Sequence, residues 1–146
     1  MKFKKTEYRS GLEEQIAKQL ESGNIPFEYE SVVLKYMVPE SDHAYTPDFI
    51  LKKKNKTSSS GAKDTENGGG CMFIEVKGYL DLEMRKKYKS IRHSNPDADI
   101  RFLFGNWDNK IRKGSKKTYR MWAEGLGFKC ANKEIPRSWI YEVDKI

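Results

Sequence analysis

The sequence has few of the residues that build zinc sites and disulfide frameworks. Its 146 residues include two cysteines, Cys71 and Cys130, and two histidines, His43 and His93. Neither cysteine belongs to a Cys-x-x-Cys pair or a His-rich segment, so a zinc site is not expected. We expect both thiols to be free, as is usual in a reducing cytoplasm.

Long apolar runs are also missing. No stretch of about 18 apolar residues occurs, so no transmembrane helix is expected, and the first ten residues, MKFKKTEYRS, lack the apolar region of a secretory signal. Hydrophobic residues make up 37% of the chain and charged residues 34%. This composition and length are typical of one polar globular domain with a core of its own.

The charge that is present is mainly positive. The formal net charge is +7 and the isoelectric point is about 9.3, which favours a polyanionic partner, nucleic acid before anionic membrane. The cations gather over residues 85–92 and 110–120, and residues 1–9 form a basic tail that is either simply solvated or seeks phosphates. For each cation the alternative is a solvated basic face. The side chains expected to bind DNA are Arg9, Lys86, Lys87, Lys89, Lys110, Arg112, Lys113, Lys116, Lys117 and Arg120.

A predicted strand over residues 72–77 carries an acid and an amine in alternate positions. Glu75 and Lys77 are two residues apart, so both side chains leave the same face of the strand, about 7 Å apart. Ile74 and Val76 point the other way, into a core. A carboxylate and an ammonium on one face of a strand are typical of a metal-dependent nuclease, although a surface ion pair is the alternative.

Asp48 lies in a second predicted strand, over residues 43–51. Pro47 precedes it and has no N–H for a sheet hydrogen bond, so we expect a strand start or a bulge there. Asp48 and Glu75 are oxygen ligands of the kind that Mg²⁺ and Mn²⁺ prefer, and the carbonyl of Val76 could join them. Lys77 could orient a water molecule and hold charge on a phosphate. For Asp48 the alternative is a capping turn.

Glu13 lies in a predicted helix over residues 10–22. Ser10 can cap that helix, and Ser10 with Glu13 fits the Ser-x-x-Glu capping box. Glu13 borders the apolar stripe, whereas Glu14 should be solvated. Glu13 therefore either closes the capping box or reaches an interior site, where it could hold a second ion. The stripe consists of Leu12, Ile16 and Leu20.

The remaining pattern predicts an α/β protein with a mixed sheet flanked by helices. Residues 26–37 are expected to be extended, and residues 38–42 to form a linker or strand break. Residues 53–70, low in apolar side chains, should form a flexible loop between antiparallel strands. A helix over 81–93, a strand over 100–104, a third helix capped by Ser115 and a packing segment over 135–139 should follow. Through residue 104 the order is helix, three strands, helix, strand.

This order, with Pro-Asp followed by Glu-x-Lys, resembles the PD-(D/E)XK (restriction-endonuclease-like) superfamily and its αβββαβ core. A more specific resemblance is to phage endonuclease I, from about residue 8 to residue 139. The matching segments are RSGLE at 9–13, KQLES at 18–22, FEYE at 27–30, YTPDF at 45–49, EVKG at 75–78 and KGS at 113–115.

The resemblance implies a Mg²⁺-dependent, structure-selective endonuclease that resolves four-way (Holliday) junctions and other branched DNA. It implies 5′-phosphate and 3′-hydroxyl ends, one or two ions per site and substitution of Mn²⁺ for Mg²⁺. The implied catalytic residues are Glu13, Asp48, Glu75 and Lys77, which favours the ligand role of Glu13 over capping alone. The implied metal ligands are Glu13, Asp48, Glu75 and Val76.

The resemblance also implies a homodimer with exchanged N-terminal segments, joined by a bridge near residues 38–42, and a location in the cytoplasm of the infected host. The nuclease domain would span residues 10–146 with an extra C-terminal helix. One departure is the insertion at 53–70, where the family has a tight turn; loop length costs free energy only logarithmically, so the strands can tolerate it. The alternatives are an inactive branched-DNA-binding module and a general nicking nuclease of the same superfamily.

Overall fold

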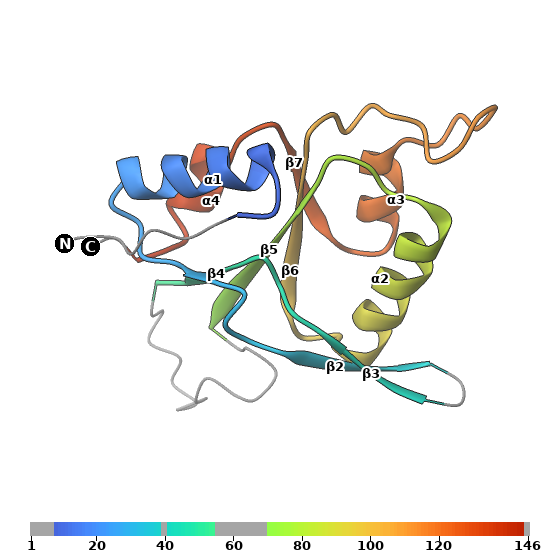
Figure 1. Cartoon of the computed structure of the whole chain (residues 1–146), viewed down its shortest axis with the longest axis horizontal. Helices are drawn as coiled ribbons and strands as arrows, with labels where there is room; N and C mark the ends of the chain where they lie inside the picture. Colours follow the sequence, from blue (N-terminus) through green and yellow to red (C-terminus); the bar gives the residue numbers. More distant parts are fainter. Residues whose placement is uncertain (1–7, 39–40, 55–69, 145–146) are drawn as a thin grey trace.

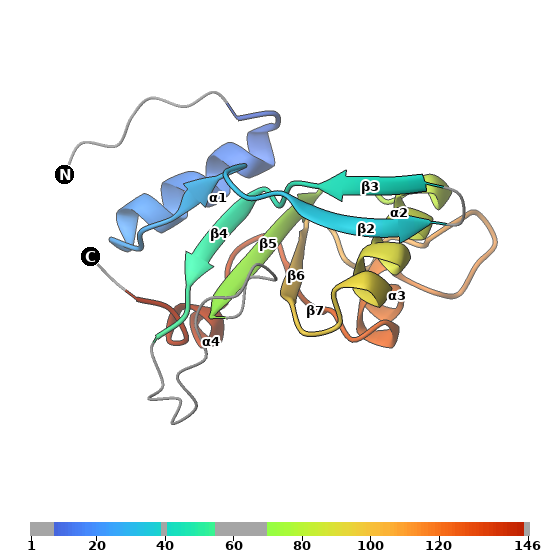
Figure 2. The ribbon, with the colours of Figure 1, turned by 90° about the horizontal axis from the view of Figure 1, so that it is seen from below.

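The computed structural model describes residues 8–38, 41–54 and 70–144, which form a mixed sheet with helices on both faces (Figures 1 and 2). The predicted α/β class is confirmed. Most of the basic tail and residues 55–69 of the expected loop lie outside the described residues. The elements are α1 Gly11–Ser22, β1 Glu28–Tyr29, β2 Leu34–Val38, β3 Ser41–Tyr45, β4 Phe49–Lys52, β5 Cys71–Lys77, α2 Leu82–Ser94, β6 Asp99–Phe104, α3 Tyr119–Gly125, β7 Lys129–Asn132 and α4 Arg137–Ile140.

The main sheet has the strand order β1-β4-β5-β6-β7. Strands β1, β4 and β5 are antiparallel to one another, and β5, β6 and β7 run parallel. The expected antiparallel pairing of the strands on either side of residues 53–70 is confirmed, with Phe49 opposite Ile74. In the main sheet the order through β6 is helix, three strands, helix, strand, as predicted. Strands β2 and β3 form a separate hairpin that packs on α2.

Each face of the sheet buries its own core. Helices α1 and α4 cover one face and α2 and α3 cover the other, as Figure 1 shows. Along β5 the side chains alternate between the cores: Ile74 and Val76 pack with the α1 core, and Phe73 packs with the α2 core. Because side chains alternate along a strand, Glu75 and Lys77 follow Phe73 toward α2.

Two predicted stretches are broken where the backbone turns. Residues 26–37 were expected to be one extended stretch, but they hold β1 and β2, and Glu30 follows β1 in the left-handed region at φ 51°. Residues 43–51 were expected to be one strand, but β3 ends at Tyr45 and β4 begins at Phe49. Pro47, which cannot donate to a ladder, lies in the gap.

Residues 38–42 were expected to form a linker or a strand break. The strand is interrupted there, because β2 ends at Val38 and β3 begins at Ser41, but the two strands pair with each other instead of being joined by an open linker. Val38 pairs with Ser41, and Met37 with Asp42, so these positions belong to the β2–β3 hairpin. The sequence also gave no sign of β7, whose residues Lys129–Asn132 include no β-branched or aromatic side chain. This short strand forms by pairing in parallel with β6 at the edge of the sheet.

The helix cap expected at Ser10 is confirmed, and the one expected at Ser115 is wrong. Ser10 caps α1, and Asp81 caps α2 through the N–H of Met84. Helix α3 is capped by Thr118 rather than by Ser115, because Thr118 Oγ1 accepts from the N–H of Met121 at 3.1 Å. Ser115 Oγ instead accepts from the N–H of Lys117 within the preceding turn.

A network of four charged residues holds the C-terminal segment against the sheet. Arg101 on β6 is 1% exposed, and its guanidinium donates to both carboxylate oxygens of Asp99 and of Glu142 at 2.7–2.9 Å. It also lies over the ring of Trp139, and Lys53 pairs with Asp99 at 3.1 Å. We call Lys53, Asp99, Arg101 and Glu142 the Arg101 network.

Two further expectations concern cysteine and membranes. Cys71 in β5 and Cys130 in β7 are thiols rather than half-cystines, as expected. Among the helices of the described residues, none combines the length and the apolar character needed to cross a bilayer.

Candidate active site

Asp48 and Glu75 come together through the pairing of β4 with β5. Because Phe49 lies opposite Ile74, continuing the antiparallel register by one residue places Asp48 opposite Glu75. The backbone N–H of Val76 donates to Oδ2 of Asp48 at 2.9 Å, which fixes the Asp48 carboxylate against β5. Asp48 is 8% exposed and Glu75 3%, so the two acids share a largely buried place.

This environment disfavours the charge on Asp48. Burial, and after it the nearby charge of Glu75, raises the pKa of Asp48 to about 8, although the N–H of Val76 opposes the shift. Glu13 adds to the repulsion, and Lys77 offsets part of it. A cation placed among these carboxylates would remove the repulsion that raises the pKa.

Glu75 has three polar partners inside the protein. The hydroxyl of Tyr45 donates to its Oε2 at 2.9 Å, and the hydroxyl of Tyr88 donates to its Oε1 at 2.6 Å. Lys77 Nζ lies 3.4 Å from the same Oε1. The expected placement of Glu75 and Lys77 on one face of a strand is what the structure has, but the pair is sheltered rather than an exposed ion pair.

Glu13 lies on the buried side of α1 and does more than cap the helix. Ser10 Oγ accepts from the backbone N–H of Glu13 at 3.1 Å, which is the capping contact. The carboxylate instead accepts from the hydroxyl of Tyr29 at 2.6 Å and from Ser10 Oγ at 3.2 Å. Burial, together with the Glu13 carboxylate, raises the pKa of Tyr29 well above its ordinary value, so Tyr29 acts as a donor here.

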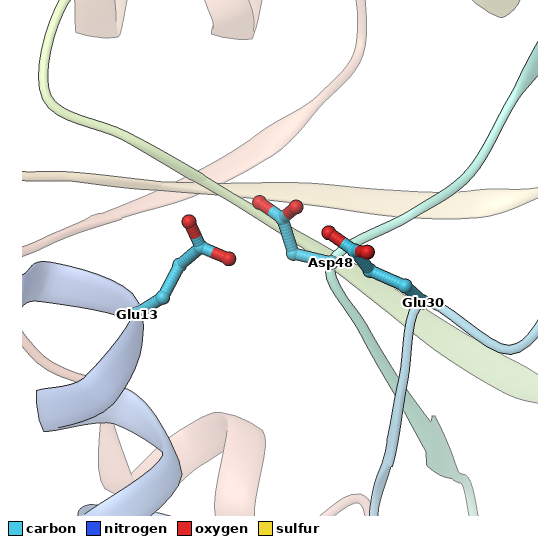
Figure 3. Close-up of side chains that lie close together, drawn as sticks. All are labelled: Glu13, Glu30 and Asp48. Carbon is cyan, nitrogen blue, oxygen red and sulfur yellow. The ribbon is translucent and has the colours of Figure 1, made fainter. Parts of the chain in front are cut away.

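Glu30 is a member of the site that the sequence did not reveal. Its carboxylate points toward those of Glu13 and Asp48, and one oxygen of each lies within 4.8 Å of the other two (Figure 3). Its N–H donates to the backbone carbonyl of Asp48 at 3.0 Å, and Arg9 pairs with its side chain at 2.8 Å. Strand periodicity gave no signal, because Glu30 reaches the site through a left-handed backbone turn. Its place in the FEYE segment at 27–30, which matches the family, was the one available indication.

We call Glu13, Glu30 and Asp48 the acid cluster. Carboxylate oxygens are the ligands that Mg²⁺ and Mn²⁺ prefer. Ligands of such an octahedral ion lie about 3 Å apart when cis and about 4.2 Å apart when trans, so the three side chains would draw closer around one ion. The donor set therefore fits a hard divalent cation. Glu75, a predicted ligand, lies beside this cluster and is held by its tyrosines. The main-chain N–H of Val76 is engaged with Asp48, and its predicted carbonyl role stays a prediction.

The predicted DNA-binding cations lie on the surface. Lys86, Lys87 and Lys89 are exposed on α2, and Lys87 Nζ lies 5.7 Å from the ring centroids of Tyr45 and Tyr88. In the segment before and within α3, Arg120 lies 4.2 Å over the ring of Trp107. The exposed cations of that segment are Lys110, Arg112, Lys113, Lys116, Lys117 and Arg120. Lys86 and Arg120 pair with acids on their own helices, whereas the acid that Arg9 pairs with, Glu30, lies beside Glu13 and Asp48.

Comparison with known proteins agrees with this arrangement. A family model of phage endonuclease I matches residues 1–146. The chain is 41% identical over 138 residues to endonuclease I of Escherichia phage T7, an alignment that covers 94% of this chain and 81% of that protein. It is 42% identical over 138 residues to endodeoxyribonuclease 1 of Enterobacteria phage T3, with coverage of 94% and 80%. The chain belongs to the phage endonuclease I family.

Proposed function

We propose that this protein is a structure-selective endodeoxyribonuclease that resolves four-way junctions and other branched DNA. The observation that carries the proposal is the acid cluster beside Glu75 and Lys77, on a protein of net charge +7. The names of the T7 and T3 relatives support endonuclease activity, and family membership supports a branched substrate. The reaction is hydrolysis of a phosphodiester to 5′-phosphate and 3′-hydroxyl ends, in the cytoplasm of the infected host.

The catalytic residues in this proposal are Glu13, Asp48, Glu75 and Lys77. Glu13 and Asp48, with Glu75 beside them, would hold one or two Mg²⁺ ions, for which Mn²⁺ can substitute, and the Val76 carbonyl would assist. A bound divalent cation lowers the pKa of water and offsets negative charge on the phosphate. Lys77, kept beside Glu75 at 3.4 Å, orients the attacking water and stabilises charge on the scissile phosphate.

The fold that this proposal assigns is the PD-(D/E)XK core. Asp48 precedes the second strand of the main sheet, and Glu75 and Lys77 lie near the end of the third, which places the motif across two antiparallel neighbours. The exposed cations of α2 and of residues 110–120 would bind phosphates, so recognition rests on the shape and backbone of the DNA. Removal of such cations should flatten the salt dependence of junction binding.

The proposed assembly is a homodimer with exchanged N-terminal segments and a bridge near residues 38–42. A junction has two equivalent exchanging strands, and a two-fold protein can place one site on each. If the N-terminal segments are exchanged, each active site contains helix α1 of one subunit and strands β4 and β5 of the other. Co-refolding Glu13→Ala with Glu75→Ala should then restore cutting at one site per dimer, whereas sites built within one chain would remain inactive.

The proposal is tested with a labelled four-way junction and a linear duplex, each with Mg²⁺ or with a chelator. We expect cutting of the junction in Mg²⁺ only, and loss of cutting with retained junction binding in Glu75→Ala and in Lys77→Ala. Persistent cutting by both variants would refute the assigned residues. Binding without hydrolysis in any divalent metal would favour the inactive binding module, and equal cutting of the duplex would favour a general nicking nuclease.

The role of Glu13 has a matched control one residue away. Glu14 lies on the exposed side of α1, where it pairs with Lys18 at 3.6 Å. We expect Glu13→Ala to reduce cutting about 10²-fold or more, whereas Glu14→Ala should cut like the wild type. If the two variants cut equally well, Glu13 serves only to cap the helix.

A further inference from the structure

Tyr88 connects the acid and the amine that the proposed chemistry requires. It lies on α2, fully buried between that helix and the sheet. Its hydroxyl donates to Oε1 of Glu75 at 2.6 Å, and Nζ of Lys77 lies 5.5 Å from the centroid of its ring. Because Lys77 Nζ is also 3.4 Å from that same Oε1, the three groups form a closed triangle of contacts.

The ring of Tyr88 is itself held in place by other rings. It meets Phe102 of β6 edge-to-face at 4.8 Å and Tyr45 of β3 edge-to-face at 5.7 Å. Such contacts favour one ring orientation over others. Tyr45 in turn donates to the second oxygen of Glu75 at 2.9 Å. The Glu75 carboxylate is therefore fixed from both sides by aromatic residues that cannot easily turn.

We propose that Tyr88 is a positioning residue, which orients Glu75 toward the bound cation and keeps Lys77 beside it; this role rests on the proposed function. Each carboxylate oxygen has two lone pairs. Oε1 of Glu75 is engaged by the Tyr88 hydroxyl and lies beside Lys77, whereas Oε2 accepts from Tyr45 and keeps a second lone pair for a metal ion. Hydrogen-bond partners of metal ligands fix the direction of the ligand, and their loss costs about 10–100-fold in metal affinity or activity.

The ring contributes in a second way. The face of an aromatic ring attracts a cation, so the Tyr88 ring favours an ammonium position close to Glu75 rather than one extended into solvent. The hydroxyl and the ring thus act on different side chains, Glu75 and Lys77, and two substitutions can separate them. Tyr88→Phe removes the hydroxyl alone, and Tyr88→Leu removes the ring as well.

A tyrosine that only fills the core would behave differently. Loss of its hydroxyl would change the free energy of unfolding but not the affinity for metal. We therefore expect Tyr88→Phe to weaken Mn²⁺ binding about 10–100-fold, measured on the full chain without DNA from the electron paramagnetic resonance signal of free Mn²⁺. Junction binding in chelator should be unchanged, and cutting should recover when Mn²⁺ is raised to saturation.

Tyr88→Leu should cut more slowly than Tyr88→Phe even at saturating Mn²⁺, because Lys77 loses the ring beside it. The matched control is Tyr119→Phe, which removes another buried hydroxyl, one that accepts from the N–H of Leu80 at 3.1 Å. It should bind Mn²⁺ like the wild type. Tyr45→Phe removes the donor at the other oxygen of Glu75 and should also weaken Mn²⁺ binding.

Equal Mn²⁺ affinity in the wild type, Tyr88→Phe and Tyr119→Phe would overturn the positioning role. The outcome is separate from that of the proposed function. If the wild type cuts junctions and Tyr88→Phe binds Mn²⁺ normally, only the positioning role fails. If Tyr88→Phe loses Mn²⁺ affinity but the wild type leaves every branched DNA intact, the proposed function fails and the role in metal binding stands. A wild type that binds no Mn²⁺ overturns both.

Discussion

The acid cluster and the Arg101 network are two partly buried charged groups packed against one sheet, and they differ in how their charge is balanced. The Arg101 network has two acids and two cations, all within hydrogen-bonding distance of a partner of opposite sign. The acid cluster, with Glu75 beside it, has four carboxylates, and within the described part of the chain its cationic partners are Arg9 and Lys77. The first group is complete within the chain, whereas the second has room for a further cation.

The pKa values show the same contrast. Burial opposes the charges of Arg101 and Asp99, but their mutual hydrogen bonds and charges outweigh it, so the pKa of Asp99 is lowered and that of Arg101 is raised. For Asp48, burial and Glu75 act in the same direction, and the pKa rises to about 8. A buried acid with a raised pKa and an acidic neighbour indicates a functional site, and a fully paired one indicates a structural role.

The largest expected effect comes from neutralising the acid cluster. Asp48→Asn keeps the size of the side chain and an oxygen that can accept from the N–H of Val76. It removes a charged ligand, so junction cutting in Mg²⁺ should fall about 10²–10³-fold or more. Gel assays under single-turnover conditions would measure this, with junction binding in chelator as the control. If the variant cuts at the wild-type rate, Asp48 is not part of the active site.

The complementary change breaks the Arg101 network. Arg101→Met leaves Asp99 and Glu142 without their main partner, and breaking such a buried pair costs about 3–5 kcal/mol. Because Glu142 is 38% exposed and can be rehydrated, we expect the lower end of this range in urea unfolding. The folded variant should cut junctions like the wild type. A variant of normal stability but low activity would mean that the two groups are coupled.

The contributions of the two groups to the free energy of unfolding should change with pH in opposite directions. The pKa of Asp48 is raised when folded, so between about pH 4 and pH 8 the folded chain holds a proton that the unfolded chain has lost, and stability falls as pH rises. The pKa of Asp99 is lowered when folded, so its contribution is present above the ordinary value of 3.8 and is lost as pH falls below it.

Unfolding free energies measured without metal from pH 3 to pH 9 would test these signs. The free energy of unfolding of Asp48→Asn should exceed that of the wild type by an amount that grows with pH and reaches about 1–3 kcal/mol near pH 8. The variant gains because no charge is buried at this position. The deficit of Asp99→Asn should shrink below about pH 4. A stability gain for Asp48→Asn that does not depend on pH would contradict the assigned pKa.

The smallest expected effect is at the edge of the Arg101 network. Lys53 pairs with Asp99, but its side chain is 33% exposed, so solvent screens the pair. Lys53→Met should therefore lower the free energy of unfolding by about 0–1 kcal/mol. Thermal unfolding in low and high salt would detect the change, which should vanish in high salt. A loss comparable with that of Arg101→Met would show that Lys53 is an equal member of the network.

The sequence predicted those parts of the site that depend on simple strand and helix periodicity. Alternation placed Glu75 and Lys77 on one face, and the helical repeat placed Glu13 next to the buried stripe. Three-dimensional contacts could not be predicted in this way. Glu30 enters through a left-handed residue, and Tyr88 looked like one more apolar position of α2. The start of α3 was predicted three residues too early, because both Ser115 and Thr118 can cap a helix. The turn that precedes the helix engages Ser115, and Thr118 becomes the cap.

The segment between β4 and β5 joins those strands at the end far from Asp48. The N–H of Lys53 donates to the carbonyl of Gly70 at 2.9 Å, which closes the ladder there, and Asp48 lies five residues back along the chain, about 17 Å along an extended strand. We therefore expect changes of length between Lys53 and Gly70 to leave the pairing of β4 with β5 near Asp48 unchanged. The segment is a natural place for an affinity peptide or a fluorophore that reports on the enzyme without disturbing it.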